Sequence, residues 1–120
     1  MEIGNRTAEF LASEGNGTRS REVVTLASGQ NVQAGAVLGK LTSGGKYRAV
    51  APGASTGAEV AAAIAYEATD ATGGDTSITV IAREAEVYLD KLVFPSGTSQ
   101  EQIDAAVAQL AEINGPIIAR

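Results

Sequence analysis

The chain contains no cysteine and no histidine, and these two absences remove much of the usual chemistry of proteins. Without cysteine there can be no disulfide, no thiol nucleophile and no Cys/His zinc site. Without histidine, the commonest acid–base group at neutral pH and the Ser-His-Asp triad are excluded as well. No pattern of carboxylates, lysines, tyrosines or serines predicts a catalytic or metal site. We therefore predict a protein that is not an enzyme and needs no cofactor.

Long apolar runs and a basic surface are also absent. No apolar stretch approaches the roughly 18 residues of a membrane span, and residues 1–4 carry no signal-peptide pattern. The net charge is −5, and all of it falls after residue 21, where eleven acidic residues stand against six basic ones. Nucleic-acid affinity depends largely on lysine and arginine contacts to phosphate. We expect a soluble protein, made in the cytoplasm, that binds neither nucleic acid nor membrane.

Large apolar side chains are scarce. Tryptophan is absent, and alanine contributes 22 residues, against 27 for leucine, isoleucine, valine and phenylalanine together. Alanine buries little area, while ordering the backbone costs about 1–2 kcal/mol per residue. We therefore expect a small, shallow core in a single domain. Such a domain would gain stability by packing against copies of itself or against a larger partner.

The middle of the sequence predicts a series of short strands. Apolar and polar residues alternate most regularly over 77–82. Two adjacent glycines between 36–41 and 47–51 predict a tight hairpin turn. Residues 59–67 are rich in alanine, which favours helix, but their strand-like neighbours lead us to predict a strand there. A further strand is predicted at 21–26, and another strand or two over 85–89 and 92–94.

One helix is predicted near the end of the sequence. Thr98 and Ser99 each begin a possible capping box, and apolar residues then recur at helical spacing over 103–113. Gly115, followed by proline, is a helix stop signal. The apolar segment 117–120 could pair as an edge strand or pack onto a neighbouring subunit. The fold class is therefore α+β and mainly β, with short strands and one helix in the C-terminal region.

The first twenty residues are predicted to form a flexible arm ahead of a domain at 21–120. Residues 1–20 are rich in turn formers and sustain no strand or helix period. Phe10 and Leu11 are the exception, a pair of large apolar side chains in a polar segment. Two interpretations stay open: a disordered terminus, or a segment that becomes ordered on docking, with Phe10 and Leu11 as anchors.

Lys46 follows two glycines at the tip of the predicted hairpin. Lipoyl- and biotinyl-type carrier domains present their modified lysine at such a tip. Those families place aspartate or methionine just before the lysine, whereas Gly45 stands there in this sequence. A carrier domain modified at Lys46 is therefore the alternative function, and a solvated turn lysine is the plain interpretation.

Several elements, in their order and spacing, resemble a known family. They are the glycine-framed strand at 35–39, the small-residue segment at 57–64, Leu-Val-Phe-Pro at 92–95 and Gly-Pro-Ile-Ile at 115–118. Together they resemble the head decoration (capsid-stabilising) proteins of lambda-like tailed bacteriophages, over residues 22–120. Phe94 is a departure, because tryptophan is expected at that place in the best-known relatives.

The resemblance implies a β-tulip-like domain that assembles as a homotrimer at the threefold positions of the expanded phage head. The partner would be the major capsid protein, and the location the outer surface of the virion. The arm would add a strand to the capsid lattice, and the trimer would clamp capsomers against the pressure of packaged DNA. The candidate arm residues are Thr7, Ala8, Glu9, Phe10 and Leu11, and the interface candidates are Ile117 and Ile118.

Overall fold

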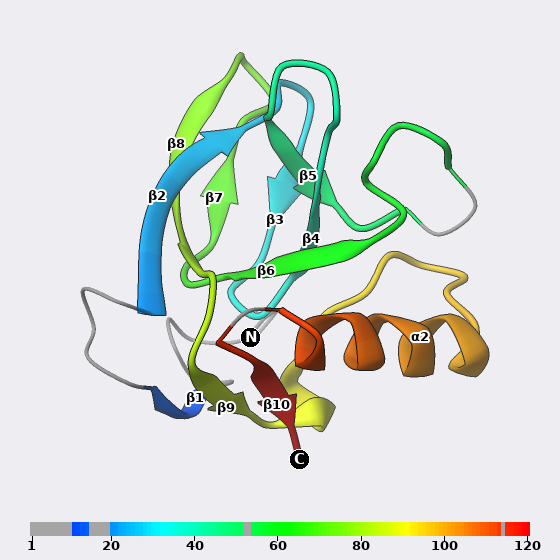
Figure 1. The fold of residues 1–120 in the computed structure, drawn as a ribbon. Coiled ribbons are helices and arrows are strands. Elements are labelled where there is room, and N and C mark those ends of the chain that lie inside the picture. The colour runs from blue at the N-terminus through cyan, green and yellow to red at the C-terminus, as the bar shows by residue number, and fades with distance from the viewer. Residues whose placement is uncertain (1–10, 15–19, 52–53, 114) are drawn as a thin grey trace, which may run out of the picture.

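A computed structural model of the chain describes residues 11–14, 20–51, 54–113 and 115–120. The described part is mainly β with one α-helix, which confirms the predicted fold class (Figure 1). A closed barrel forms the upper part of Figure 1. In pairing order its strands are β2 (Arg21–Leu26), β5 (Tyr47–Ala49), β4 (Val37–Lys40), β6 (Ala61–Ala65) and β8 (Thr76–Ile81), and β8 pairs back onto β2. Two short strands, β3 (Asn31–Val32) and β7 (Thr69–Asp70), pair beside them.

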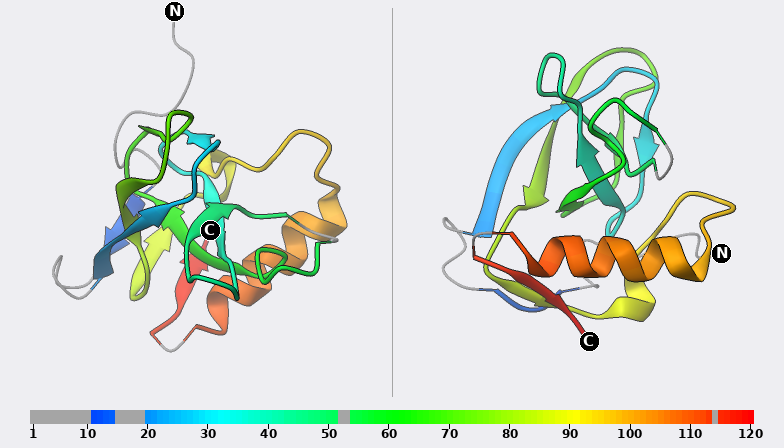
Figure 2. Two further views of the ribbon diagram at one scale, coloured as in Figure 1. Left: turned by 90° about the horizontal axis from the view of Figure 1, so that it is seen from above. Right: turned by 45° about the vertical axis from the view of Figure 1, so that its right-hand side comes forward.

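A lower layer covers one side of the barrel. It contains the α-helix α2 (Gln100–Ala111), the 3-10 helix η1 (Leu89–Lys91) and a sheet of β1 (Leu11–Glu14), β9 (Ala85–Val87) and β10 (Ile117–Ala119). β9 is the central strand of this sheet, with β1 antiparallel on one side and β10 parallel on the other. The right-hand view of Figure 2 shows α2 running across the base of the barrel, and α2 contacts both β6 and β10.

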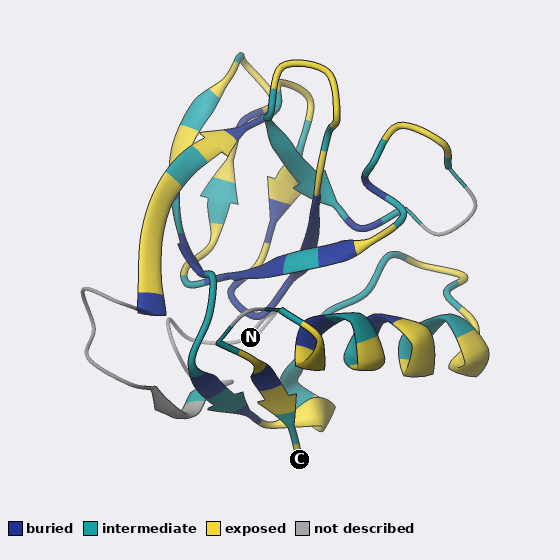
Figure 3. Cartoon of the chain, in the orientation of Figure 1, coloured by how far each residue is buried: buried dark blue, intermediate teal, exposed yellow. Residues whose placement is uncertain are grey.

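The two layers create two hydrophobic clusters, one inside the barrel and one beneath it. β8 shows why, because successive side chains of a strand point to opposite faces. Ile78 and Val80 point into the barrel, whereas Ile81 points out of it and is covered by the lower layer. Leu110 of α2 and Ile117 of β10 are fully buried against the same outer face of the barrel. Figure 3 shows the buried positions concentrated where the barrel meets this layer.

Several elements predicted from the sequence are confirmed. The hairpin pairs β4 with β5, and the alanine-rich segment is strand β6. The helix begins after Ser99, whose hydroxyl accepts a hydrogen bond from the Gln102 backbone N–H, while the Gln102 side chain accepts one from the Ser99 N–H. Of the two possible capping boxes, this is the one that forms. The helix ends earlier than the stop signal predicted: its C-cap is Glu112, and Gly115, with a φ of 85°, lies in the turn beyond it.

Two local predictions were wrong. Residues 92–94 form no strand. The chain turns through η1 just before them, and their strand pairing is limited to an isolated bridge between Val93 and Ala36. The sequence also predicted no strand before residue 21, yet residues 11–14 form β1. The four residues of β1 have almost no strand signal of their own. Their conformation is stabilised by pairing with β9, a partner distant in the sequence.

Candidate functional site

The lower sheet contains three of the seven residues named as candidates from the sequence. Leu11 lies on β1 opposite Val87 of β9, and its side chain packs against the lower hydrophobic cluster. Ile117 and Ile118 lie on β10, on the other side of β9. The remaining candidates lie outside the described residues: Thr7, Ala8, Glu9 and Phe10.

Ile117 and Ile118 have opposite environments, because neighbouring side chains on a strand point to opposite faces. The side chain of Ile117 is fully buried among the core residues of the lower layer. Ile118 points outward, and 42% of it is exposed. Ile117 therefore stabilises the domain itself, and Ile118 is the residue of the pair that a partner can touch.

Ile118 belongs to an exposed surface on the outer side of the lower sheet, which we call the terminal-sheet face and define by Glu86, Tyr88, Ile118 and Arg120. Glu86 lies opposite Ile118 in the strand register, and its carboxylate is 2.8 Å from the Arg120 guanidinium. Tyr88 follows two residues after Glu86 and is 45% exposed. The face thus presents two large apolar side chains beside a solvent-exposed ion pair, a composition suited to contact with another protein.

Lys46 lies at the opposite end of the domain and takes part in a tether between loops. Its ammonium is 2.6 Å from the Asp75 carboxylate, and the same carboxylate accepts a hydrogen bond of 2.9 Å from the Ser28 backbone N–H. The bond from Lys46, followed by the bond from Ser28, lowers the pKa of Asp75. The lysine at this hairpin tip therefore joins the hairpin to the turn before β8, a structural role that the sequence did not reveal.

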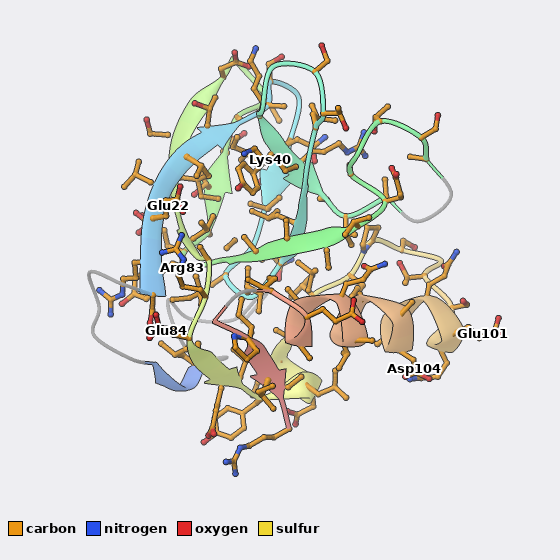
Figure 4. All side chains as sticks on the ribbon, viewed as in Figure 1. Glu22, Lys40, Arg83, Glu84, Glu101 and Asp104 are labelled. Carbon is orange, nitrogen blue, oxygen red and sulfur yellow. The ribbon has the colours of Figure 1, made fainter. Side chains whose placement is uncertain are left out.

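The charged side chains do not converge on a reaction centre in the described part of the chain. Figure 4 shows Glu22 and Arg83 on the barrel, far from Glu101 and Asp104 on α2. Glu22 and Arg83 form an ion pair of 2.7 Å. Among residues 11–14, 20–51, 54–113 and 115–120, no three metal-binding side chains cluster together. No helix within those ranges is long and apolar enough to cross a membrane.

A comparison with protein families shows which family this chain belongs to. The family model described as bacteriophage lambda head decoration protein D matches residues 1–116. The chain therefore belongs to the phage head decoration family, as its resemblance indicated. A search of the curated proteins found no match. The family consists of structural proteins rather than enzymes, and membership associates this chain with the capsid of a phage head.

Proposed function

We propose that this chain binds the outer surface of the expanded phage head as trimers at the threefold sites and stabilises the shell against the pressure of packaged DNA. The observation that supports the proposal is the family match, which includes the N-terminal segment as well as the domain. The partner is the major capsid protein. The mechanism is binding energy repeated over many equivalent sites, with no turnover.

The N-terminal segment is proposed to make the first contact. Leu11, the residue that follows this segment, is held in β1 at one edge of the lower sheet. Thr7 to Phe10 would dock on the capsid as an extended strand, with Phe10 as the apolar anchor. Ordering such a segment costs free energy, so one copy binds weakly. Three copies presented by one trimer would bind together much more tightly, because the second and third contacts are effectively intramolecular.

The terminal-sheet face is proposed as the second part of the interface. It lies on the same sheet as β1, so a capsid surface that receives the segment ahead of β1 is also close to Ile118. Burial of Ile118 and Tyr88 would add apolar contact area to the main-chain contacts of the segment. No observation favours a carrier function, since Lys46 is tied to Asp75 and the family match is to decoration proteins.

The proposal is tested by mixing purified protein with expanded, undecorated heads, pelleting the heads and counting the bound copies. We expect saturable binding in multiples of three. A form lacking residues 1–10 keeps β1 and should lose binding while its thermal unfolding remains cooperative. Failure of the full chain to bind its cognate expanded heads would overturn the proposal.

A pair of matched substitutions tests the terminal-sheet face. Ile118→Asp places a charge on the face and should weaken head binding at least about tenfold, since a desolvated charge at an interface is costly. Val60→Asp is the control, because Val60 is 47% exposed and lies outside the terminal-sheet face. Equal head binding by the two variants would show that Ile118 is not part of the interface.

A further inference from the structure

β2 is paired along its whole length on one side only. All six of its residues align with β8, from Arg21 opposite Ile81 to Leu26 opposite Thr76. On its other side, β5 joins it at Leu26 alone, opposite Tyr47. The barrel is therefore closed at one end of β2 and splayed at the other, as the separation of β2 from β5 in Figure 1 shows.

The direction of the backbone hydrogen bonds shows which residues line the splayed side. The Ala82 N–H donates to the Ser20 carbonyl at 2.7 Å, and bonded pairs alternate along an antiparallel ladder. Residues 22, 24 and 26 therefore bond to β8, and the backbone groups of Val23 and Thr25 point away from it. The Ala27 N–H continues this alternation by donating to Tyr47 at 2.8 Å. The parallel bridge of Leu26 with Tyr47 pairs the Thr25 carbonyl with the Tyr47 N–H. Among the described residues, the groups without a strand partner on this side are therefore the N–H and C=O of Val23 and the N–H of Thr25.

The side chains on this stretch are also open to solvent. Val24 points toward the cluster inside the barrel, whereas Val23 points outward and is 68% exposed. No other large apolar residue in the described ranges is as exposed. Figure 3 shows β2 exposed along most of its length. A β-branched strand with unpaired backbone groups is a template for another strand, and native proteins normally cover or blunt such edges.

We infer that the free side of β2 at Val23 and Thr25 accepts an extended segment of the major capsid protein, which adds a strand to the barrel. The inference rests on the proposed function. Unpaired N–H and C=O groups in strand geometry select an extended backbone rather than a helix or a small molecule. β2 follows the proposed docking segment in the sequence, with β1 between them, and both contacts would be made to the same shell.

A second copy of the chain is the less suitable occupant. Two β2 strands that pair through the same edge are related by a twofold axis, because such an interface is isologous. A twofold contact does not build the threefold assembly proposed above. The capsid protein has no such restriction, since each β2 in a trimer could receive a segment from a different capsid subunit.

The test removes one backbone donor without touching the ladder to β8. Val23→Pro deletes the outward N–H, and proline is tolerated on edge strands. Val23→Ala is the matched control, because it removes the exposed side chain and keeps the N–H. In the head-pelleting assay we expect Val23→Pro to bind at least about tenfold more weakly than the full chain, and Val23→Ala to bind within about twofold. Thr25→Pro repeats the test at the second open position.

Hydrogen exchange on the unmodified protein provides a readout that does not depend on a variant folding. On binding to heads, the amides of Val23 and Thr25 should become protected. If the full chain binds heads, but neither proline variant weakens binding and no protection appears, the inference is wrong and the proposed function stands. If proline substitution instead dissociates a soluble oligomer, a second copy occupies the edge and the capsid assignment is wrong. Failure of the full chain to bind heads overturns both.

Discussion

The Gln109 side chain on α2 accepts a hydrogen bond of 2.8 Å from the backbone N–H of Ala61 on β6. Ala61 is only 2% exposed, so water cannot easily replace this partner. The bond connects the helix to the barrel at a point where the register between β4 and β6 shifts. A polar side chain thus holds together two layers that otherwise meet through apolar contacts.

Replacing Gln109 with leucine should destabilise the domain by about 1–3 kcal/mol, because the buried Ala61 N–H would lose its acceptor. Gln109→Glu keeps an acceptor of the same length and should cost less. Urea unfolding of both variants at neutral pH measures the difference. Equal stability of the leucine and glutamate variants would mean that the hydrogen bond contributes nothing beyond packing.

Gly39 on β4 should not tolerate a methyl group. A Cβ atom at this position would lie 2.4 Å from the Ala58 carbonyl oxygen and 2.7 Å from the Ala58 Cα, both backbone atoms that cannot rotate away. We expect Gly39→Ala to lower the free energy of unfolding by about 1–3 kcal/mol or more. Gly73→Ala is the control, because nothing lies within 4 Å of its Cβ position, and it should be neutral within about 0.5 kcal/mol. A neutral Gly39→Ala variant in the same denaturation assay would contradict the packing described here.

The contrast between local and distant causes explains what the sequence could predict. The hairpin β4–β5, the alternation of β8 and the capping box of α2 depend on neighbouring residues. The first two were predicted correctly, and the capping box is one of the two that the sequence offered. The Gln109–Ala61 bond and the strand β1 depend on residues far away in the chain. No local pattern encodes such partners, so neither could be predicted.

The Lys46–Asp75 tether makes stability depend on pH in a defined direction. The folded pKa of Asp75 lies below its ordinary value of 3.8, first because of Lys46 and then because of the Ser28 N–H. A depressed carboxyl pKa stabilises the folded state above the unfolded-state pKa, and this contribution disappears as the pH falls through the folded pKa. Asp75→Asn should therefore lower Tm slightly at pH 7, and the difference from the unmodified protein should shrink as the pH falls below the ordinary carboxyl pKa of 3.8. Thermal melts at several pH values measure this.

Lys46→Met provides the control for the tether. It should lower Tm at pH 7 as Asp75→Asn does, and the double variant should lose less than the sum of the two single losses, because the two residues share one interaction. Additive losses would show that the exposed pair is not coupled in solution, as is true of many surface ion pairs.

Glu84 adopts a left-handed backbone, with a φ of 54°. This conformation costs a residue with a Cβ roughly 1–2 kcal/mol relative to glycine, part of which glycine loses again through its freer unfolded state. We expect Glu84→Gly to be more stable than Glu84→Ala by about 1 kcal/mol. Comparing these two variants isolates the backbone, because both remove the glutamate side chain. A more stable alanine variant would contradict a left-handed requirement at this position.

The candidate site was predictable only in part. Ile117 and Ile118 were both named as interface candidates from the sequence. Which of them would be buried was not visible there, because burial depends on α2 and the barrel lying on one face of β10. The free side of β2 could likewise not be predicted from the sequence. The pattern at 21–26 predicts a strand, but only the geometry of the barrel decides how many of its neighbours are present.

The position of β9 between β1 and β10 sets an order of events during synthesis. β1 is made early and β10 late, yet both complete the same small sheet. At translation rates of about 5–20 residues per second, Leu11 waits roughly 5–20 seconds before residues 117–119 exist. During that interval the apolar side chains of Leu11 and Val87 are without part of their final cover, and neighbouring nascent chains can compete for them. The sheet of β1, β9 and β10 is therefore completed only when the last residues of the domain have been made.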